Sequence, residues 1–443
     1  LRNQERLPVT LRKLRVITPI LALTACDNQP QETITTPLPE QAQVQYEVPA
    51  QQASAFAADI GLKAYTSLSM ATQGAQELDS SLQSFLYHPG QVTHKEVQQA
   101  WRNAYSAYLR TLLFSRLPIA DPPDWHKQGI DYQQTLALLD SWPIEGGYID
   151  HVPGYPFSGI VNDLTLELNE ETLLAQHGFS DPTYASLGFH AFEFMLWGAD
   201  GQRAPDDFFP QENTAPVVTA TEGSMPPAGE TLPAVTDSGD NTDAAGLATD
   251  VQNHNRRRQY IQLVSEQLQK HLHRLQRRWE PSNGYYANLV QRSEPMQVIA
   301  ATLNATQKLL SDELLGKRMS ADSSEFSHSS PEDIRALVQG LRDIWLPQTD
   351  TEDSENGEDG GSSASSDEST RESGIALLLA EPQKTTLLSA WQEKFGAIDH
   401  ALDQWEAGQQ SEQNRQQVRE QLISLMPVLQ RSAAALNIPL RTE

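Results

Sequence analysis

The chain has 443 residues, of which 38% are hydrophobic, and its formal net charge is −26. This length allows two domains of ordinary size. The acidic balance disfavours nucleic-acid binding, because phosphate contacts need clustered Lys and Arg, and it also disfavours docking on an anionic membrane through a basic surface.

The first 25 residues are typical of a bacterial lipoprotein signal peptide. Basic residues precede a short apolar run at 16–23, which is too short to span a bilayer. The following Leu-Thr-Ala-Cys resembles a lipobox, in which Cys26, the only cysteine, becomes the lipidated first residue; the alternative is an ordinary buried Cys. We therefore predict a periplasmic protein held to a membrane by its N-terminal lipid, and Asp27 favours the inner membrane.

Three further segments lack the apolar surface that would offset the entropy cost of ordering them. Residues 26–50 are rich in Pro, Gln and Thr and are predicted to be a flexible tether. Residues 211–250 contain seven acidic and no basic residues, and residues 347–373 contain nine acidic residues against Arg371. We predict that both are disordered acidic loops.

The remaining sequence has the three- and four-residue apolar spacing of helices. Strand-like alternation is not found, so the fold class is predicted to be all-α, with two packed helical bundles at 51–205 and 251–435. The predicted helices are 51–87, 93–117, 128–141, 160–177, 182–197, 251–280, 296–316, 331–346, 383–406 and 411–435.

One predicted helix carries ionisable residues among apolar ones. Asp181 and Pro182 are typical of a helix start and Gly198 of a helix end. Between them, His190 and Glu193 are three residues apart and therefore share a face.

The other residues of this helix are apolar on every side, which predicts burial. Burying a carboxylate is costly unless a cation, a metal or hydrogen-bond donors receive it. Glu193 is therefore expected to have a partner inside the protein.

The residues alone leave two interpretations of this pair open. Imidazole and carboxylate both bind iron, zinc or manganese, and helical bundles build metal sites from such pairs. The alternative is a hydrogen-bonded His–Glu pair that only stabilises the bundle. The zinc-protease motif His-Glu-x-x-His is missing from the sequence.

Gly188-Phe189-His190-Ala191-Phe192-Glu193, with Gly198 after it, resembles the Gly-x-His-x-x-Glu signature of the imelysin-like family, peptidase family M75, which includes insulin-cleaving membrane protease and iron-regulated protein A. Flanking segments are also similar, namely Trp101-Arg102 through Tyr108, Ser141-Trp142-Pro143-Ile144 with Ile149-Asp150, and Glu325-Phe326-Ser327-His328 with Asp333. The resemblance implies two packed helical bundles, a secreted or lipid-anchored protein tied to iron uptake, and classification as a metallopeptidase.

Three functions follow as hypotheses. In the first, His190 and Glu193 bind iron or an iron-bearing partner without turnover, in contact with iron-uptake or redox proteins, and Trp142, Ser327 and Asp333 are candidate pocket residues. In the second, the chain is a metallopeptidase with zinc on His190. In the third, the pair is structural and a surface binds another protein. Catalysis is not assigned, because a metal hydrolase needs three ligands, an open water position and a base.

The sequence also predicts the surroundings of two histidines and two tryptophans. His271 and His273 lie in an arginine-rich helix and are predicted to face solvent. Trp391 and Trp405 are predicted to pack in the core.

Overall fold

The computed structural model describes residues 47–117, 132–211, 253–347, 373–408 and 411–440. Their regular structure is helical, which confirms the all-α prediction; the division into two bundles stays a prediction. The elements are α1(Ala50–Tyr87), α2(Gln91–Leu109), α3(Leu112–Ser115), α4(Tyr132–Leu139), α5(Gly146–Ile149), α6(Glu170–Gln176), α7(Phe189–Trp197), the 3-10 helix η2(Pro205–Phe208), α9(His254–Arg278), α10(Tyr285–Arg292), α11(Pro295–Lys308), the π-helix η3(Leu309–Arg318), α12(Ser330–Trp345), α13(Ile375–Leu378), α14(Gln383–Ala407) and α15(Glu412–Ala435).

Several predictions fall outside these residues. They are the signal peptide, Cys26, nearly all of the tether, and nearly all of both acidic loops. Among the helices that are described, none is long and apolar enough to cross a membrane.

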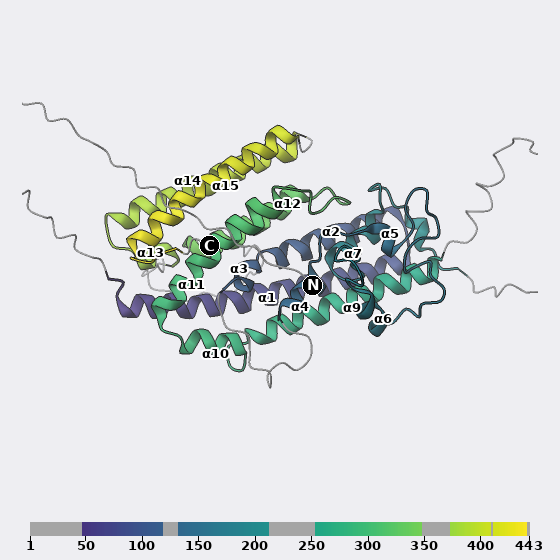
Figure 1. Cartoon of the computed structure of the whole chain (residues 1–443), viewed down its shortest axis with the longest axis horizontal. Helices are drawn as coiled ribbons and strands as arrows, with labels where there is room; N and C mark the ends of the chain where they lie inside the picture. Colours follow the sequence, from purple (N-terminus) through teal and green to yellow (C-terminus); the bar gives the residue numbers. More distant parts are fainter. Residues whose placement is uncertain (1–46, 118–131, 212–252, 348–372, 409–410, 441–443) are drawn as a thin grey trace, which may run out of the picture. The chain divides into compact units, whose positions relative to one another are not determined.

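Helix α1 is the element against which most others pack. Its apolar residues recur every three or four positions from Phe56 to Phe85, and they form one buried stripe. α2 and α9 lie along it, and α10, α11 and α13 also contact it (Figure 1). Helices from both halves of the sequence therefore share the core around α1.

The C-terminal hairpin of α14 and α15 packs on α12 and η3. Its core contains Trp391, which is fully buried and donates from Nε1 to Ser432 Oγ at 3.0 Å, and Trp405, which is 3% exposed. The prediction that both tryptophans lie in the core is confirmed.

A buried cluster of one carboxylate and two arginines joins the segments that precede and follow α7. Asp150 is fully buried and accepts from Arg203 Nη1 at 2.9 Å and from Arg257 Nε at 2.6 Å. Since Arg203 follows α7 and Arg257 lies near the start of α9, the Asp150 carboxylate ties the segment after α7 to α9.

The predicted start of the helix at Pro182 is wrong. α7 begins at Phe189, and the Asp181 side chain caps a turn instead, accepting from Thr183 N at 2.8 Å. Gly188 has φ +103°, which is not a helical conformation, so a helix that started at Pro182 could not continue through Gly188. The predicted end is confirmed, because Gly198 follows the last residue with φ +71°.

Three other predicted helices differ from the observed ones. The segment predicted at 93–117 divides into α2 and α3 at the turn residues 110 and 111. The segment predicted at 160–177 is helical only from Glu170 to Gln176, because turns occupy its first half. The segment predicted at 296–316 changes its winding from α to π at Leu309.

The prediction that His271 faces solvent is wrong. It is 1% exposed, whereas His273 is exposed as predicted. Burial, aided by Arg274 and Lys270, lowers the pKa of His271 to about 4. The apolar stripe of α9 is wide enough to include position 271, next to Leu272.

His271 should make the protein sensitive to acid. Between pH 6.5 and 4 the unfolded chain binds a proton that folded His271 does not, so the free energy of unfolding should fall by up to roughly 3 kcal/mol as the pH drops through this range. His271→Gln should remove this loss in urea unfolding curves, and His273→Gln serves as the exposed control. Equal pH dependence in the wild type and in His271→Gln would contradict the assignment.

Candidate functional site

The candidate site is built around α7, whose nine residues are all buried. Gly188 lets the start of α7 approach the end of α4, since a Cβ at this position would lie 2.7 Å from the backbone oxygen of Leu139. Trp101 of α2 fixes the same turn by donating from Nε1 to Phe189 O at 2.9 Å. The helix start is therefore held between α2 and α4.

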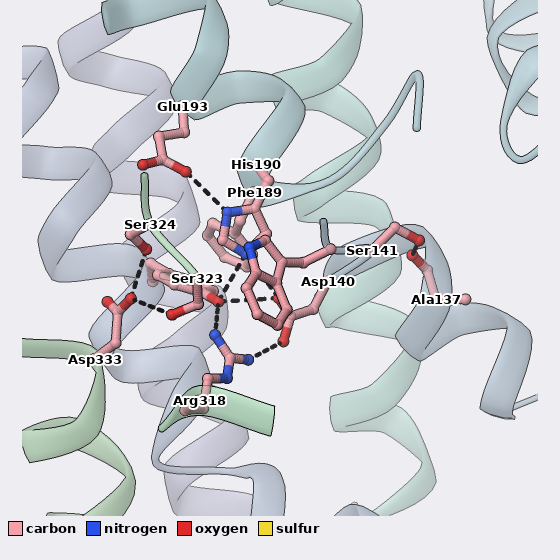
Figure 2. A network of polar contacts seen from close by, with 12 residues as sticks. Ala137, Asp140, Ser141, Phe189, His190, Glu193, Arg318, Ser323, Ser324 and Asp333 are labelled. Atoms are coloured by element: carbon pink, nitrogen blue, oxygen red, sulfur yellow. Dashed lines mark hydrogen bonds and ion pairs between the residues drawn. The ribbon is translucent and has the colours of Figure 1, made fainter. Parts of the chain in front are cut away.

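His190 is 1% exposed, and both its ring nitrogens have partners (Figure 2). Nδ1 lies 2.8 Å from Glu193 Oε2. Nε2 lies 3.1 Å from Asp140 Oδ1 and 3.0 Å from the Tyr105 hydroxyl. The i, i+3 spacing supplies Glu193 on one side and the end of α4 supplies Asp140 on the other, so His190 lies between two carboxylates.

Glu193 is fully buried and has partners, as predicted from its surroundings. Besides His190, Ser327 donates to Oε1 from its backbone nitrogen at 2.9 Å and from its hydroxyl at 2.6 Å. These three contacts fix the carboxylate, which in turn orients the imidazole.

Arg318, at the end of η3, lies on the other side of Asp140 and is also fully buried. It donates from Nη2 to Asp140 Oδ2 at 2.9 Å, from Nη1 to the Tyr105 hydroxyl at 2.8 Å and from Nε to Glu313 Oε1 at 2.7 Å. Arg116 in turn donates to Glu313 Oε2 at 2.5 Å.

We call this connected row of side chains, alternating in charge, the ion row. Its members are Arg116, Glu313, Arg318, Asp140, His190 and Glu193.

The ion row shifts the protonation of its members. Burial alone lowers the pKa of His190, but its hydrogen bonds to Asp140 and Glu193 outweigh this effect and raise the pKa to about 9. Burial also opposes ionisation of Asp140, but Arg318 and His190 hold the pKa of that carboxyl well below its usual range. At neutral pH His190 is therefore a cation between two anions.

The three candidate pocket residues contact different side chains around the site. Ser327 contacts Glu193 directly. Asp333, at the start of α12, accepts from Ser324 at 2.5 Å and from Ser323 at 3.3 Å. Trp142 lies over Arg318, with 5.9 Å between the guanidinium carbon and the ring centroid.

Sequence reasoning missed Tyr105, Asp140 and Arg318 as site residues. Tyr105 lies on the apolar stripe of α2 and looks like core, and Asp140 ends a short helix. Arg318 is 128 positions from His190 in the sequence. The segment from Ser141 to Ile144, which contributes to the family resemblance, was the available pointer to Asp140.

No group of three or more His, Cys, Asp or Glu side chains in the described ranges could hold a metal ion. A metal site on His190 therefore needs a donor of another type. The Tyr105 hydroxyl meets this need, because it lies 2.9 Å from Asp140 Oδ1 and 3.0 Å from His190 Nε2. Two oxygens and one nitrogen thus lie within 3.1 Å of one another.

Gly188→Ala should destabilise the fold strongly. The conformation at φ +103° and ψ −180° is essentially restricted to glycine, and the added methyl would also meet Leu139 O. The expected loss is more than about 2 kcal/mol in thermal or urea unfolding.

Gly154→Ala is the matched control for this substitution. Its φ is +85°, but a Cβ there meets nothing within 4 Å, so it isolates backbone strain from contact. Equal losses for the two variants would contradict the close approach of α7 and α4.

Asp333 should make stability fall as pH rises. Burial raises the pKa of its carboxyl to about 7, so between pH 4 and 7 the folded state binds a proton that the unfolded chain has lost. Relative to Asp333→Asn, the wild type should lose up to roughly 4 kcal/mol of unfolding free energy over this range. Asp200→Asn, on an exposed loop, is the control, and a wild-type curve parallel to that of Asp333→Asn would refute the prediction.

Comparisons with known proteins agree with this architecture. The family model Peptidase M75, described as Imelysin, matches residues 61–431. Among solved structures, a putative iron-regulated protein A precursor from Parabacteroides distasonis ATCC 8503 is similar, with a TM-score of 0.54 and 13% identity over 89% of this chain and 97% of that one. This likeness shows the fold alone. A comparison with curated proteins finds no match. Since the family model covers most of the chain, the protein belongs to the imelysin family.

Proposed function

We propose that this imelysin-family protein binds iron, as cargo in bacterial iron uptake, without cleaving peptide bonds. The observation that carries the proposal is that His190 Nε2, Asp140 Oδ1 and the Tyr105 hydroxyl lie within 3.1 Å of one another. Because His190 is protonated in the metal-free protein, iron would bind Nε2 by displacing its proton. Carboxylate and phenol oxygens are hard donors, and imidazole suits iron as well as zinc.

Glu193 acts here by orienting the ligand histidine. A metal-binding histidine commonly donates its other ring nitrogen to a carboxylate, which fixes the ring and its tautomer. His190 Nδ1 donates to Glu193, and Ser327 immobilises that carboxylate with two hydrogen bonds. The sequence-based prediction that Glu193 is itself a ligand stays a prediction.

Two features disfavour peptide hydrolysis. A hydrolytic metal needs an open position for water and a separate base. Here Arg318, a permanent cation, contacts the Tyr105 hydroxyl and the second oxygen of Asp140, Oδ2, and every member of the donor set is at most 8% exposed. Retention of an ion, not turnover, is the activity that fits such an enclosed set.

The proposal includes the location inferred from the N-terminus. Lipidation of Cys26 would hold the protein at a membrane, in the periplasm, where it could receive iron or an iron-bearing protein. The similar Parabacteroides protein is titled iron-regulated, which supports the connection with iron.

Iron titration of the purified protein tests the proposal. One equivalent should bind, Tyr105→Phe should weaken binding roughly tenfold to a hundredfold, and His190→Ala should abolish it. His273→Ala, on an exposed surface, should bind like the wild type. Circular dichroism and thermal unfolding establish that each variant is folded.

Two results would overturn the proposal. Unchanged iron binding in folded His190→Ala and Tyr105→Phe would place the metal elsewhere. Zinc-dependent cleavage of a denatured protein that is lost in His190→Ala would support the peptidase interpretation instead.

A further inference from the structure

The π-helix η3 continues directly from α11, with ten residues from Leu309 to Arg318. π-winding is rare, usually limited to a single turn inside an α-helix, and frequent at functional sites. Here it persists to the last residue, where Met319 N donates to Leu314 O, five positions back, at 2.9 Å. A segment this long in an unusual winding needs contacts that hold it.

The π-winding of η3 depends on the absence of a side chain at Gly316. A Cβ at this position would lie 2.9 Å from Ser311 O, the carbonyl five residues earlier. Alanine, the best α-helix former, would therefore be strained in the π form and favoured in the α form.

Arg318 holds the last residue of η3 to the candidate site. Two of its nitrogens donate to Asp140 and Tyr105, which lie outside η3, and Nε donates to Glu313, five residues earlier within η3. Rewinding to α would rotate Arg318 away from these acceptors. Leaving the buried Asp140 without its cation is costly unless another cation replaces it.

The opposite side of η3 contacts the C-terminal hairpin. Arg419 Nη1 of α15 donates to Leu315 O at 3.0 Å, and Arg415 Nη2 donates to Arg318 O at 3.3 Å. Both acceptors are carbonyls at the end of η3, so their direction depends on the winding.

We propose that η3 is a two-state element that couples the donor set to helix α15. In the state described, Arg318 donates to Asp140 Oδ2 and to the Tyr105 hydroxyl, η3 is π-wound, and α15 is anchored by its two arginines. When a cation takes Asp140 Oδ1 and the Tyr105 hydroxyl, its charge repels Arg318 from that hydroxyl and from Asp140 Oδ2, η3 rewinds toward α, and α15 loosens. The trigger rests on the proposed function, but the mechanical coupling does not, and the coupling is reciprocal.

Gly316→Ala tests the coupling without any metal. Hydrogen exchange measured by mass spectrometry should be roughly tenfold faster in the first turns of α15, residues 412–425, because the arginine–carbonyl bonds are lost. Gly396→Ala is the matched control, since Gly396 lies inside α14 and a Cβ there meets nothing within 4 Å. It should leave exchange at 412–425 unchanged.

Tyr105→Phe provides a second, conservative variant. This substitution removes the Tyr105 hydroxyl, one of the acceptors of Arg318. Like Gly316→Ala, it should make hydrogen exchange at 412–425 faster. Tyr108→Phe removes a phenol hydroxyl one turn away and should not. Wild-type exchange at 412–425 in both folded variants, Gly316→Ala and Tyr105→Phe, would overturn the inference.

Iron added to the wild type separates this inference from the proposed function. With binding established by metal analysis, exchange at 412–425 should rise as it does in Gly316→Ala. Bound iron with unchanged exchange at 412–425 would refute the inference and leave the proposed function standing. If iron does not bind, the proposed function fails, and the metal-free variants decide the coupling alone.

Discussion

The burial of charge is the constraint on which the rest of this structure depends. The ion row places three cations and three anions in alternation, and three of its members, Arg318, His190 and Glu193, are at most 1% exposed. Removing one partner of a buried pair costs far more than the pair itself contributes, because the other charge remains unsolvated. Each member of the ion row therefore fixes the position of the next one.

This dependence explains why the surrounding backbone is unusual. The left-handed Gly188 brings α7 against the end of α4, which sets His190 beside Asp140. The π-winding of η3 directs Arg318 to the other oxygen of the same carboxylate. Departures from regular helix thus occur at the two positions where segments distant in the sequence deliver opposite charges.

Inferring the site from sequence succeeded where the signal was local. Apolar residues on all sides of Glu193 predicted both its burial and its need for a partner, and the spacing predicted that it shares a helix face with His190. The same reasoning failed at Pro182, because a helix that began there could not continue through Gly188, whose φ is +103°. It failed at His271 because one imidazole at the edge of an apolar stripe carries no sign of the packing that covers it.

The sequence by itself determined the helical class, the buried His–Glu pair and membership of a recognisable family, because periodicity and short spacings are properties of neighbouring residues. Only the tertiary structure decided that Tyr105, Asp140 and Arg318 complete the site. These three come from α2, from the end of α4 and from η3, and the sequence around each of them gives no indication of the other two. Their meeting is set by how the helices pack, since only the folded chain brings charges that are far apart in sequence close enough to neutralise one another.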